Sequence, residues 1–296
     1  MVYKTVINFK KQIMRKKQIT SLIVLMIPVL FPSCYKETGD KLDEQEKFYR
    51  DNPEAIAQLK FVHAYTPLTI NGLSTSLATT STGFRITMDG IKINGAMNTS
   101  PSTNTIRYGG QPDTVTYTAS FFPTTATYSF VQPGSHNFRF IMNRIVSGAH
   151  APTTADQVFN STVGLTPGKK YTMFIADPYA PPATYMIEDN FQVPNRNSYG
   201  IRFVNLCADA ASRFDVVSKR YGSKLFSDVG YKEMKDFIYL GTTTQDTLYL
   251  YTAGTNTIVS QINGFLPVTE RVYTLYARGK TGTTGRTPSL TFYTNR

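Results

Sequence analysis

The chain has 296 residues, with 31 Lys and Arg against 20 Asp and Glu, so its formal net charge is +11. Six of the basic residues and none of the acidic ones lie in the first 33 positions, which leaves 25 − 20 = +5 for the remainder. That charge is ordinary for a soluble surface, and no Lys and Arg run with interleaved aromatic residues is present. The composition therefore argues against a nucleic-acid-binding protein.

The N-terminal segment, residues 1–33, has the pattern of a secretory signal. Its basic start precedes an apolar run from Leu22 to Phe31, which is shorter than the roughly 20 residues of a membrane-spanning helix. Ser33 and Cys34 follow, and the segment resembles the lipobox of bacterial lipoproteins. The resemblance implies cleavage between Ser33 and Cys34, with acyl chains on Cys34 anchoring the protein in the membrane. We expect a bacterial envelope location, at the outer membrane, facing the periplasm or the cell surface.

Two other interpretations of this segment stay open. One is a plain secretory signal cut near Ser33, and the other is a short N-terminal anchor that is not cleaved. Met14 begins a shorter signal of ordinary form, so it is an alternative start. Residues 34–56 are rich in charge and are predicted to form a polar tether, with a helix packed on the folded part as the alternative.

Beyond the tether, the sequence predicts an all-β protein. It is rich in Thr, Tyr and Phe, and turn residues recur at short intervals, which is typical of many short strands. We expect two tandem immunoglobulin-like or transthyretin-like β-sandwich domains, at 57–194 and 195–296. Asp89-Gly90 predicts a tight hairpin turn. In the first domain the predicted strands are 59–64, 84–88, 91–93, 114–122, 126–131, 137–145, 169–176 and 184–187, with a long loop at 94–112.

Four strand-like segments recur in the same order in the second half of the chain. The matched pairs are 58–63 with 200–205, 84–87 with 214–217, 137–141 with 247–251, and 170–176 with 271–277. Recurrence in order and spacing favours two copies of one β-domain.

These strands also resemble a known family. The first half contains the strand Lys60–Ala64 (K-F-V-H-A), the strand and turn Phe84–Gly90 (F-R-I-T-M-D-G), the motif Leu165–Phe174 (L-T-P-G-K-K-Y-T-M-F) and the acidic segment Ile187–Asn190. Together they are similar to the domain of unknown function 4397 family of bacterial surface and secreted proteins. The family has no established activity, so the resemblance implies fold and location only.

We find no catalytic or metal-binding motif. His63, His136 and His150 each lack a second ligand at the spacing of common metal sites. Glu188 and Asp189 are adjacent on a predicted strand, where side chains point to opposite faces, which argues against a shared site. No cofactor and no metal are expected, and the protein is predicted not to be an enzyme.

The two cysteines have separate predicted roles. With Cys34 committed to lipid, Cys207 has no disulfide partner. Cys207 lies in an apolar stretch, and we interpret it as a small buried hydrophobe.

The sequence favours a non-catalytic binding or adhesion role. Tyr179, in a Pro-rich loop, and Tyr108, in the long loop, are candidate ligand contacts for a surface glycan or a protein partner. One alternative is a pilin-like structural subunit that assembles by strand exchange after proteolysis, with Arg50 as a candidate cut site. A further alternative is a glycan-binding accessory protein.

Overall fold

The computed structural model describes residues 52–64, 69–70, 73–74, 83–93, 115–116, 121–122, 128–142, 157–176, 184–209, 211–241, 244–282 and 287–296. The chain divides into two compact units, Met1–Ala55 and Ile56–Arg296, and all the described strands belong to the second. In the first unit, the regular element described is the short 3-10 helix η1 (Pro53–Ala55). The predicted signal and most of the predicted tether lie outside the described residues. No helix in the described part of the chain is long and apolar enough to cross a membrane.

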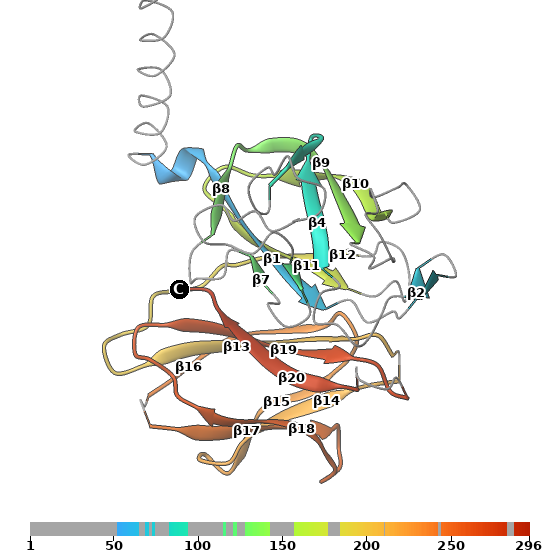
Figure 1. Ribbon diagram of the computed structural model, residues 1–296. Coiled ribbons are helices and arrows are strands. Elements are labelled where there is room, and N and C mark those ends of the chain that lie inside the picture. The colour runs from blue at the N-terminus through green and yellow to red at the C-terminus, as the bar shows by residue number, and fades with distance from the viewer. Residues whose placement is uncertain are drawn as a thin grey trace, which may run out of the picture. The chain divides into compact units, whose positions relative to one another are not determined.

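The fold is all-β, as predicted, and the second unit is built from sheets packed face to face (Figure 1). In the N-terminal pair, one sheet has the order β12 (Thr184–Glu188), β11 (Lys170–Ala176), β1 (Ala57–Ala64) and β7 (Phe121–Phe122), and β8 (Ser129–Val131) also pairs with β1. The other has the order β10 (Gln157–Leu165), β9 (Gly134–Met142), β4 (Gly83–Met88) and β5 (Ile91–Lys92), and β6 (Val115–Thr116) pairs with β4. A separate hairpin is formed by β2 (Thr69–Ile70) and β3 (Leu73–Ser74).

The C-terminal pair is formed by two four-stranded sheets. One has the order β16 (Met234–Leu240), β13 (Tyr199–Cys207), β19 (Val272–Gly279) and β20 (Ser289–Thr294). The other has the order β15 (Ser223–Val229), β14 (Phe214–Ser218), β17 (Asp246–Thr252) and β18 (Ile258–Phe265). The predicted division at 194/195 falls between β12 and β13. Because both pairs lie in one compact unit, that division stays a prediction.

One strand prediction was wrong. The single strand expected over 114–122 is represented by β6 and β7, and these pair with different sheets, β6 with β4 and β7 with β1. The chain therefore changes sheet within this stretch, which an unbroken run of strand-forming residues did not reveal.

In each sheet pair, the two sheets pack against each other through a core rich in aromatic side chains. In β9, Phe138 and Phe140 are fully buried, while Arg139 between them is only partly buried, as the alternation of strand side chains requires. Both rings lie 6.1 Å from the ring of Phe61 in β1, on the facing sheet. Burying side chains of this size stabilises the fold by about 1.5–3 kcal/mol each. A second core in the C-terminal pair includes Cys207, which is fully buried, so its predicted role as a small core residue is confirmed.

The central strands β1, β11, β13 and β19 are buried on both faces. Their burial is nearly continuous along their length, because one face meets a sandwich core and the other meets a third apolar cluster. That cluster joins Val62, Phe174 and Ile187 from the N-terminal pair to Val204 and Tyr276 from the C-terminal pair. The two sheet pairs are thus in direct apolar contact through these strands.

The parallel pairs β1–β11 and β13–β19 have the same register. Lys60 is paired with Thr172 in the first, and Arg202 is paired with Thr274 in the second. Since Lys60 was matched with Arg202, Thr172 must be matched with Thr274. The expected match of 170–176 with 271–277 is therefore one residue out of step, because it aligned two basic residues at the strand start.

Candidate functional site

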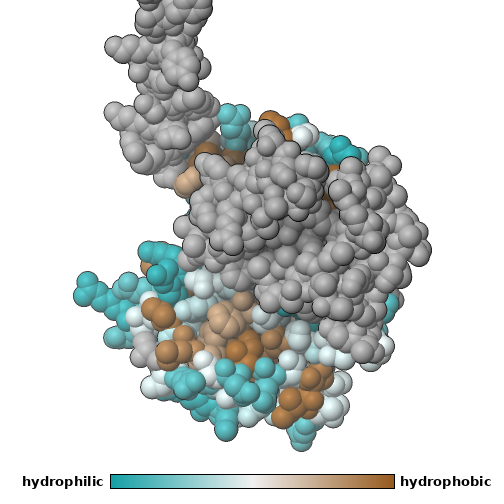
Figure 2. Space-filling view, in the orientation of Figure 1, coloured by the Kyte–Doolittle hydropathy of each residue, from teal (hydrophilic) through white to brown (hydrophobic). Residues whose placement is uncertain are grey.

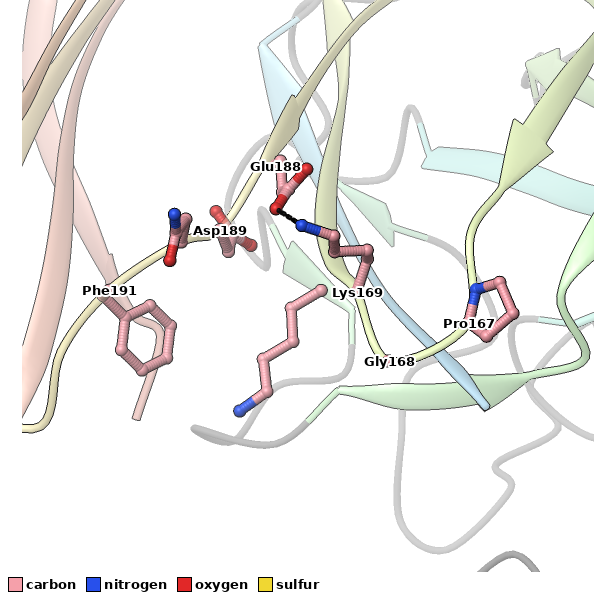
Figure 3. Close-up of a pocket in the computed structure, with 8 residues that line it drawn as sticks. Pro167, Gly168, Lys169, Glu188, Asp189 and Phe191 are labelled. Atoms are coloured by element: carbon pink, nitrogen blue, oxygen red, sulfur yellow. Dashed lines mark hydrogen bonds and ion pairs between the residues drawn. The ribbon is translucent and has the colours of Figure 1, made fainter. Parts of the chain in front are cut away.

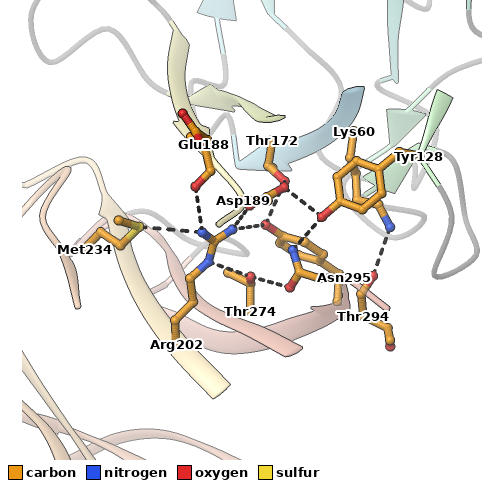
Figure 4. Close-up of polar contacts among 11 residues, drawn as sticks. Lys60, Tyr128, Thr172, Glu188, Asp189, Arg202, Met234, Thr274, Thr294 and Asn295 are labelled. Carbon is orange, nitrogen blue, oxygen red and sulfur yellow. Dashed lines mark hydrogen bonds and ion pairs between the residues drawn. The ribbon is translucent and has the colours of Figure 1, made fainter. Parts of the chain in front are cut away.

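A buried carboxylate lies where the two sheet pairs meet. Asp189 follows β12, and its backbone N–H donates to Lys170 O at 2.7 Å, which extends the pairing of β12 with β11. Its Oδ2 accepts hydrogen bonds from the hydroxyls of Thr172, at 2.6 Å, and Tyr128, at 2.8 Å. Its Oδ1 pairs with the guanidinium of Arg202, from β13 (Figure 4). The ion pair is almost fully buried and joins the N-terminal sheets to the C-terminal ones.

Arg202 is the other half of this pair, and its guanidinium has partners on several sides. Nε donates to Thr274 Oγ1 at 2.9 Å, Nη1 to Glu188 O at 3.4 Å, and the plane lies 4.6 Å from the ring centre of Phe237. Burial lowers the pKa of Arg202, but the charge of Asp189 and the contacts with Tyr293, together with the hydrogen bonds to both, outweigh burial and raise the pKa above its usual value. The side chain is therefore a permanent buried cation.

Two hydrogen-bond relays run from Arg202 back to the same carboxylate. In one, Arg202 donates to Tyr293, which donates to Thr172, which donates to Asp189. The other relay runs from Arg202 through Thr274, Asn295 and Tyr128, in that order, and also ends on Asp189. Every step has a defined donor, and Asp189 is the common acceptor. Burial raises the pKa of Tyr128, and the nearby carboxylate raises it further, which keeps its hydroxyl a donor.

Lys60 is a second buried cation on the N-terminal side of this network. Its Nζ donates to Thr294 O at 2.9 Å and lies 5.0 and 5.6 Å from the ring centres of Tyr128 and Tyr293. Burial lowers the pKa of Lys60 to about 8, and the attraction of Asp189 opposes part of that shift. At neutral pH the ammonium is mostly protonated and contacts carbonyl and ring groups of both sheet pairs.

The network follows the matched registers of the two sheet pairs. Lys60 donates to a carbonyl at the end of β20, and Arg202 donates to a carbonyl at the end of β12. Thr172 bonds Asp189 at 2.6 Å, and in the matching place Thr274 bonds Asn295, also at 2.6 Å. The contact is therefore reciprocal in its geometry, although an acid in the first half corresponds to an amide in the second and a lysine corresponds to an arginine. We call these eight residues the interface network: Lys60, Tyr128, Thr172, Asp189, Arg202, Thr274, Tyr293 and Asn295.

A small pocket opens beside the interface network. It has a volume of about 300 Å³ and lies between the β10–β11 turn, Pro167–Lys170, and the segment Glu188–Phe191 after β12 (Figure 3). The turn is tight, with Gly168 at φ 72°, a conformation that glycine adopts without strain. Lys169 forms an exposed ion pair with Glu188 at 2.6 Å. The pocket combines charged side chains with the aromatic ring of Phe191.

Lys170 contacts aromatic rings in the pocket, whereas Lys169 is paired with a carboxylate. Lys170 Nζ lies 5.2 Å from the ring centre of Phe191 and 5.9 Å from that of Tyr128. Phe191 is itself positioned by an edge contact with Phe237, at 5.8 Å between ring centres. Figure 3 shows Glu188 and Lys169 joined at one side of the pocket, with the ring of Phe191 at the other.

Several residues singled out in the sequence lie elsewhere. Ser33, Cys34, Tyr108, Tyr179 and His150 are outside the described residues, so their roles stay predictions. His136 is engaged at both ring nitrogens, with Asp89 at 2.7 Å and Gln132 O at 2.8 Å. This arrangement holds the pKa of the Asp89 carboxyl below its usual range. His63 is fully buried, and its carbonyl accepts a hydrogen bond from Arg278 at 3.1 Å. Within the described ranges, no three His, Cys, Asp or Glu side chains gather as a metal site would require.

Sequence reasoning missed the interface network. One signal was present: Lys60 and Arg202 each interrupt an apolar strand at the same place in the two matched segments. A long cation that recurs inside two apolar strands indicates a buried position with a specific partner, because Lys and Arg are rarely buried unless they are paired. Glu188 and Asp189 do point apart, as strand alternation predicts, with side-chain exposures of 40% and 0%.

The surface of the C-terminal pair carries separate apolar patches. In Figure 2, brown side chains lie among teal ones over this part of the molecule. The exposed large apolar residues here are Tyr221, Tyr239, Ile258, Leu266 and Val268.

Comparison with known proteins gives one family match. The family model of a domain of unknown function, DUF4397, matches residues 96–217, which supports the resemblance seen in the sequence over that range. The match runs from the N-terminal pair into β14. No curated protein matches the chain.

The solved structures that match include one with low-level similarity. A chain from Bacteroides fragilis NCTC 9343, described as a candidate cell adhesion protein, is 10% identical, and the alignment covers 81% of this chain and 98% of that one. Its TM-score is 0.19.

Proposed function

We propose that this chain is a lipid-anchored protein of the bacterial envelope, whose β-sheet unit binds a partner without catalysing a reaction. The observation that carries the proposal is the use made of the buried ionisable groups. Asp189 and Lys60, from the N-terminal sheet pair, and Arg202, from the C-terminal pair, each form hydrogen bonds with the other pair. Their partners are neighbouring side chains or backbone carbonyls. These three buried groups hold the two sheet pairs together, so their protons are engaged in structural contacts and are not available to a substrate.

The same reasoning applies to the other buried carboxylates. Asp215 accepts from Lys224 at 2.6 Å and from two backbone N–H groups, and Asp246 accepts from the Ser218 hydroxyl and the Arg220 N–H. Each carboxylate accepts hydrogen bonds from donors at a turn or a strand end of the C-terminal pair. These contacts support a rigid binding scaffold, on which function resides at the surface.

We further propose that the two sheet pairs are tandem copies of one domain. The support is the shared register of their parallel strands, together with matched turns before β11 and β19. Lys169 N–H donates to Thr166 O and Arg271 N–H donates to Val268 O, both at 3.3 Å. In the same turns, Tyr171 OH accepts the Thr166 N–H and Tyr273 OH accepts the Val268 N–H.

The anchor is tested by Cys34→Ala in the full chain. We expect the wild-type protein to sediment with membranes and to require detergent for release, because acyl chains on Cys34 hold it there. The variant should be recovered in the soluble envelope fraction. Equal membrane recovery of both proteins would overturn the anchor.

The binding role is tested with the Cys34→Ala chain and envelopes from the producing bacterium. Saturable retention, displaced by unlabelled protein, is the expected result. Release of reducing ends or peptides during the incubation would overturn the non-catalytic role, and absence of saturable retention would overturn binding. A ladder of SDS-resistant oligomers after cleavage near Arg50 would instead establish the pilin-like alternative.

A further inference from the structure

We infer that the pocket between the β10–β11 turn and the segment after β12 binds an acidic sugar residue, one that carries a carboxylate on a pyranose ring. The inference rests on the proposed binding function and names the ligand class of one site. In this assignment Lys170 contacts the carboxylate, Phe191 contacts the ring face, and Glu188 with Asn190 contacts the hydroxyls.

The charge of the pocket is the first argument. Of its two lysines, Lys169 is paired with Glu188, and the Asp189 carboxylate is paired with Arg202. Among the described residues, Lys170 has ring contacts only, with no carboxylate at ion-pair distance. One positive charge at the pocket is therefore not balanced by an acid. An anion entering it gains a charge-assisted hydrogen bond, which is about twice as strong as a neutral one.

The size of the pocket is the second argument. A volume of about 300 Å³ is at the lower end of the range for small-molecule sites, which is roughly 300–1,000 Å³. It suits one sugar ring or a comparable small anion. The pocket is open to solvent along its exposed residues, Lys169 and Glu188 among them, so the ring can belong to a longer polymer that continues outside.

The aromatic wall is the third argument. Phe191 is held from behind by Phe237, and the next residue is fixed because Gln192 N–H donates to Tyr239 OH at 2.9 Å. A ring positioned in this way offers a flat apolar surface of the kind that the C–H face of a pyranose covers. Its contact with the Lys170 ammonium brings the apolar and cationic groups side by side, which matches a sugar whose carboxylate projects from the ring edge.

The remaining polar groups discriminate between anions. Glu188 offers a carboxylate acceptor to hydroxyl donors, of which a pyranose ring presents more than inorganic phosphate does. Asn190 is exposed and offers both a donor and an acceptor. No Arg lines the pocket, although Arg is the usual bidentate partner of phosphate groups.

The test is a titration of the full chain carrying Cys34→Ala, followed by ¹H–¹⁵N correlation spectra. The probes are D-glucuronate, D-glucose and inorganic phosphate. We expect glucuronate to shift the amide signals of residues 168–170 and 188–192, with an affinity at least tenfold higher than that of glucose or phosphate. Lys170→Gln should weaken glucuronate binding at least tenfold, while Lys219→Gln, an exposed lysine of the C-terminal pair, should leave it unchanged.

Several results would overturn the inference of an acidic-sugar site. Equal binding of phosphate would reduce the site to a general anion site, and equal binding of glucose would remove the role of charge; either overturns the inference. So would shifts elsewhere in the chain, or no shift at all. Failure here with saturable envelope retention intact refutes the ligand class alone, whereas loss of retention refutes the proposed binding function.

Discussion

The two sheet pairs have the same strand registers but differ at the position where they meet. After β12 the N-terminal pair has Asp189, and after β20 the C-terminal pair has Asn295 in the matching place. The cations differ too, Lys60 in the first pair and Arg202 in the second. A strictly symmetric contact would place two carboxylates or two amides at its centre. The observed one places a single acid against the cation of the other half, so each half complements its neighbour.

The largest effect is expected from Asp189→Asn, which gives the N-terminal pair the same residue that the C-terminal pair has at Asn295. The variant would leave Arg202 buried without its counter-charge and would turn an amide donor toward groups that already donate. Removing one partner of a buried ion pair costs about 3–5 kcal/mol, so we expect a loss of that size in the free energy of unfolding. Urea unfolding measures it.

The matched control is the neighbouring residue. Glu188→Gln removes an exposed ion pair with Lys169, and exposed pairs contribute little because water and salt screen them. If both variants lowered the free energy of unfolding equally, the interface network would not be what holds the sheet pairs together.

Lys60 and Arg202 are expected to differ in how they make the free energy of unfolding depend on pH. Burial lowers the pKa of Lys60 from 10.5 to about 8, so between these values the unfolded chain holds a proton that the folded chain has lost. Stability rises with pH wherever the unfolded state binds more protons, so this group adds about 3 kcal/mol between pH 8 and 10.5. Arg202, in the matching place, stays charged and adds no such rise.

The measurement is the difference in unfolding free energy between the wild type and Lys60→Met. We expect that difference to grow in favour of the wild type from pH 7.5 to pH 10. Burial raises the pKa of Tyr128 and of Tyr293, so both hydroxyls stay protonated in the folded protein over this pH range. Parallel curves for the two proteins would show that Lys60 is not desolvated in the folded state.

The sequence predicted what depends on neighbours along the chain. Asp89 and Gly90 were expected to turn a hairpin, and they do so with φ values of 51° and 82° between β4 and β5. Alternation also predicted that Glu188 and Asp189 would face opposite sides. Such features are set by turn chemistry and by the pleat of a strand, which act over a few residues.

What the sequence did not predict depends on residues far apart in the chain. Lys60 meets Thr294, and Asn295 meets Tyr128, only because the sheet pairs pack against each other. The register of β19 was misplaced by one residue for a related reason. The match depends on which residue of β1 or β13 each strand is paired with, and a comparison of residue types does not show that pairing.

The smallest expected effect concerns the matched turns before β11 and β19. Gly168 has φ 72° in the first turn, and Glu270 has φ 62° in the second, although a side chain at positive φ costs about 1 kcal/mol. Glu270→Gly should therefore raise the free energy of unfolding by somewhat less than about 1 kcal/mol, because glycine also gains entropy when unfolded. Gly168→Ala should lower it by about 1 kcal/mol. Thermal and urea unfolding of the two variants measure both changes, and effects of the same sign would show that the turns are not equivalent.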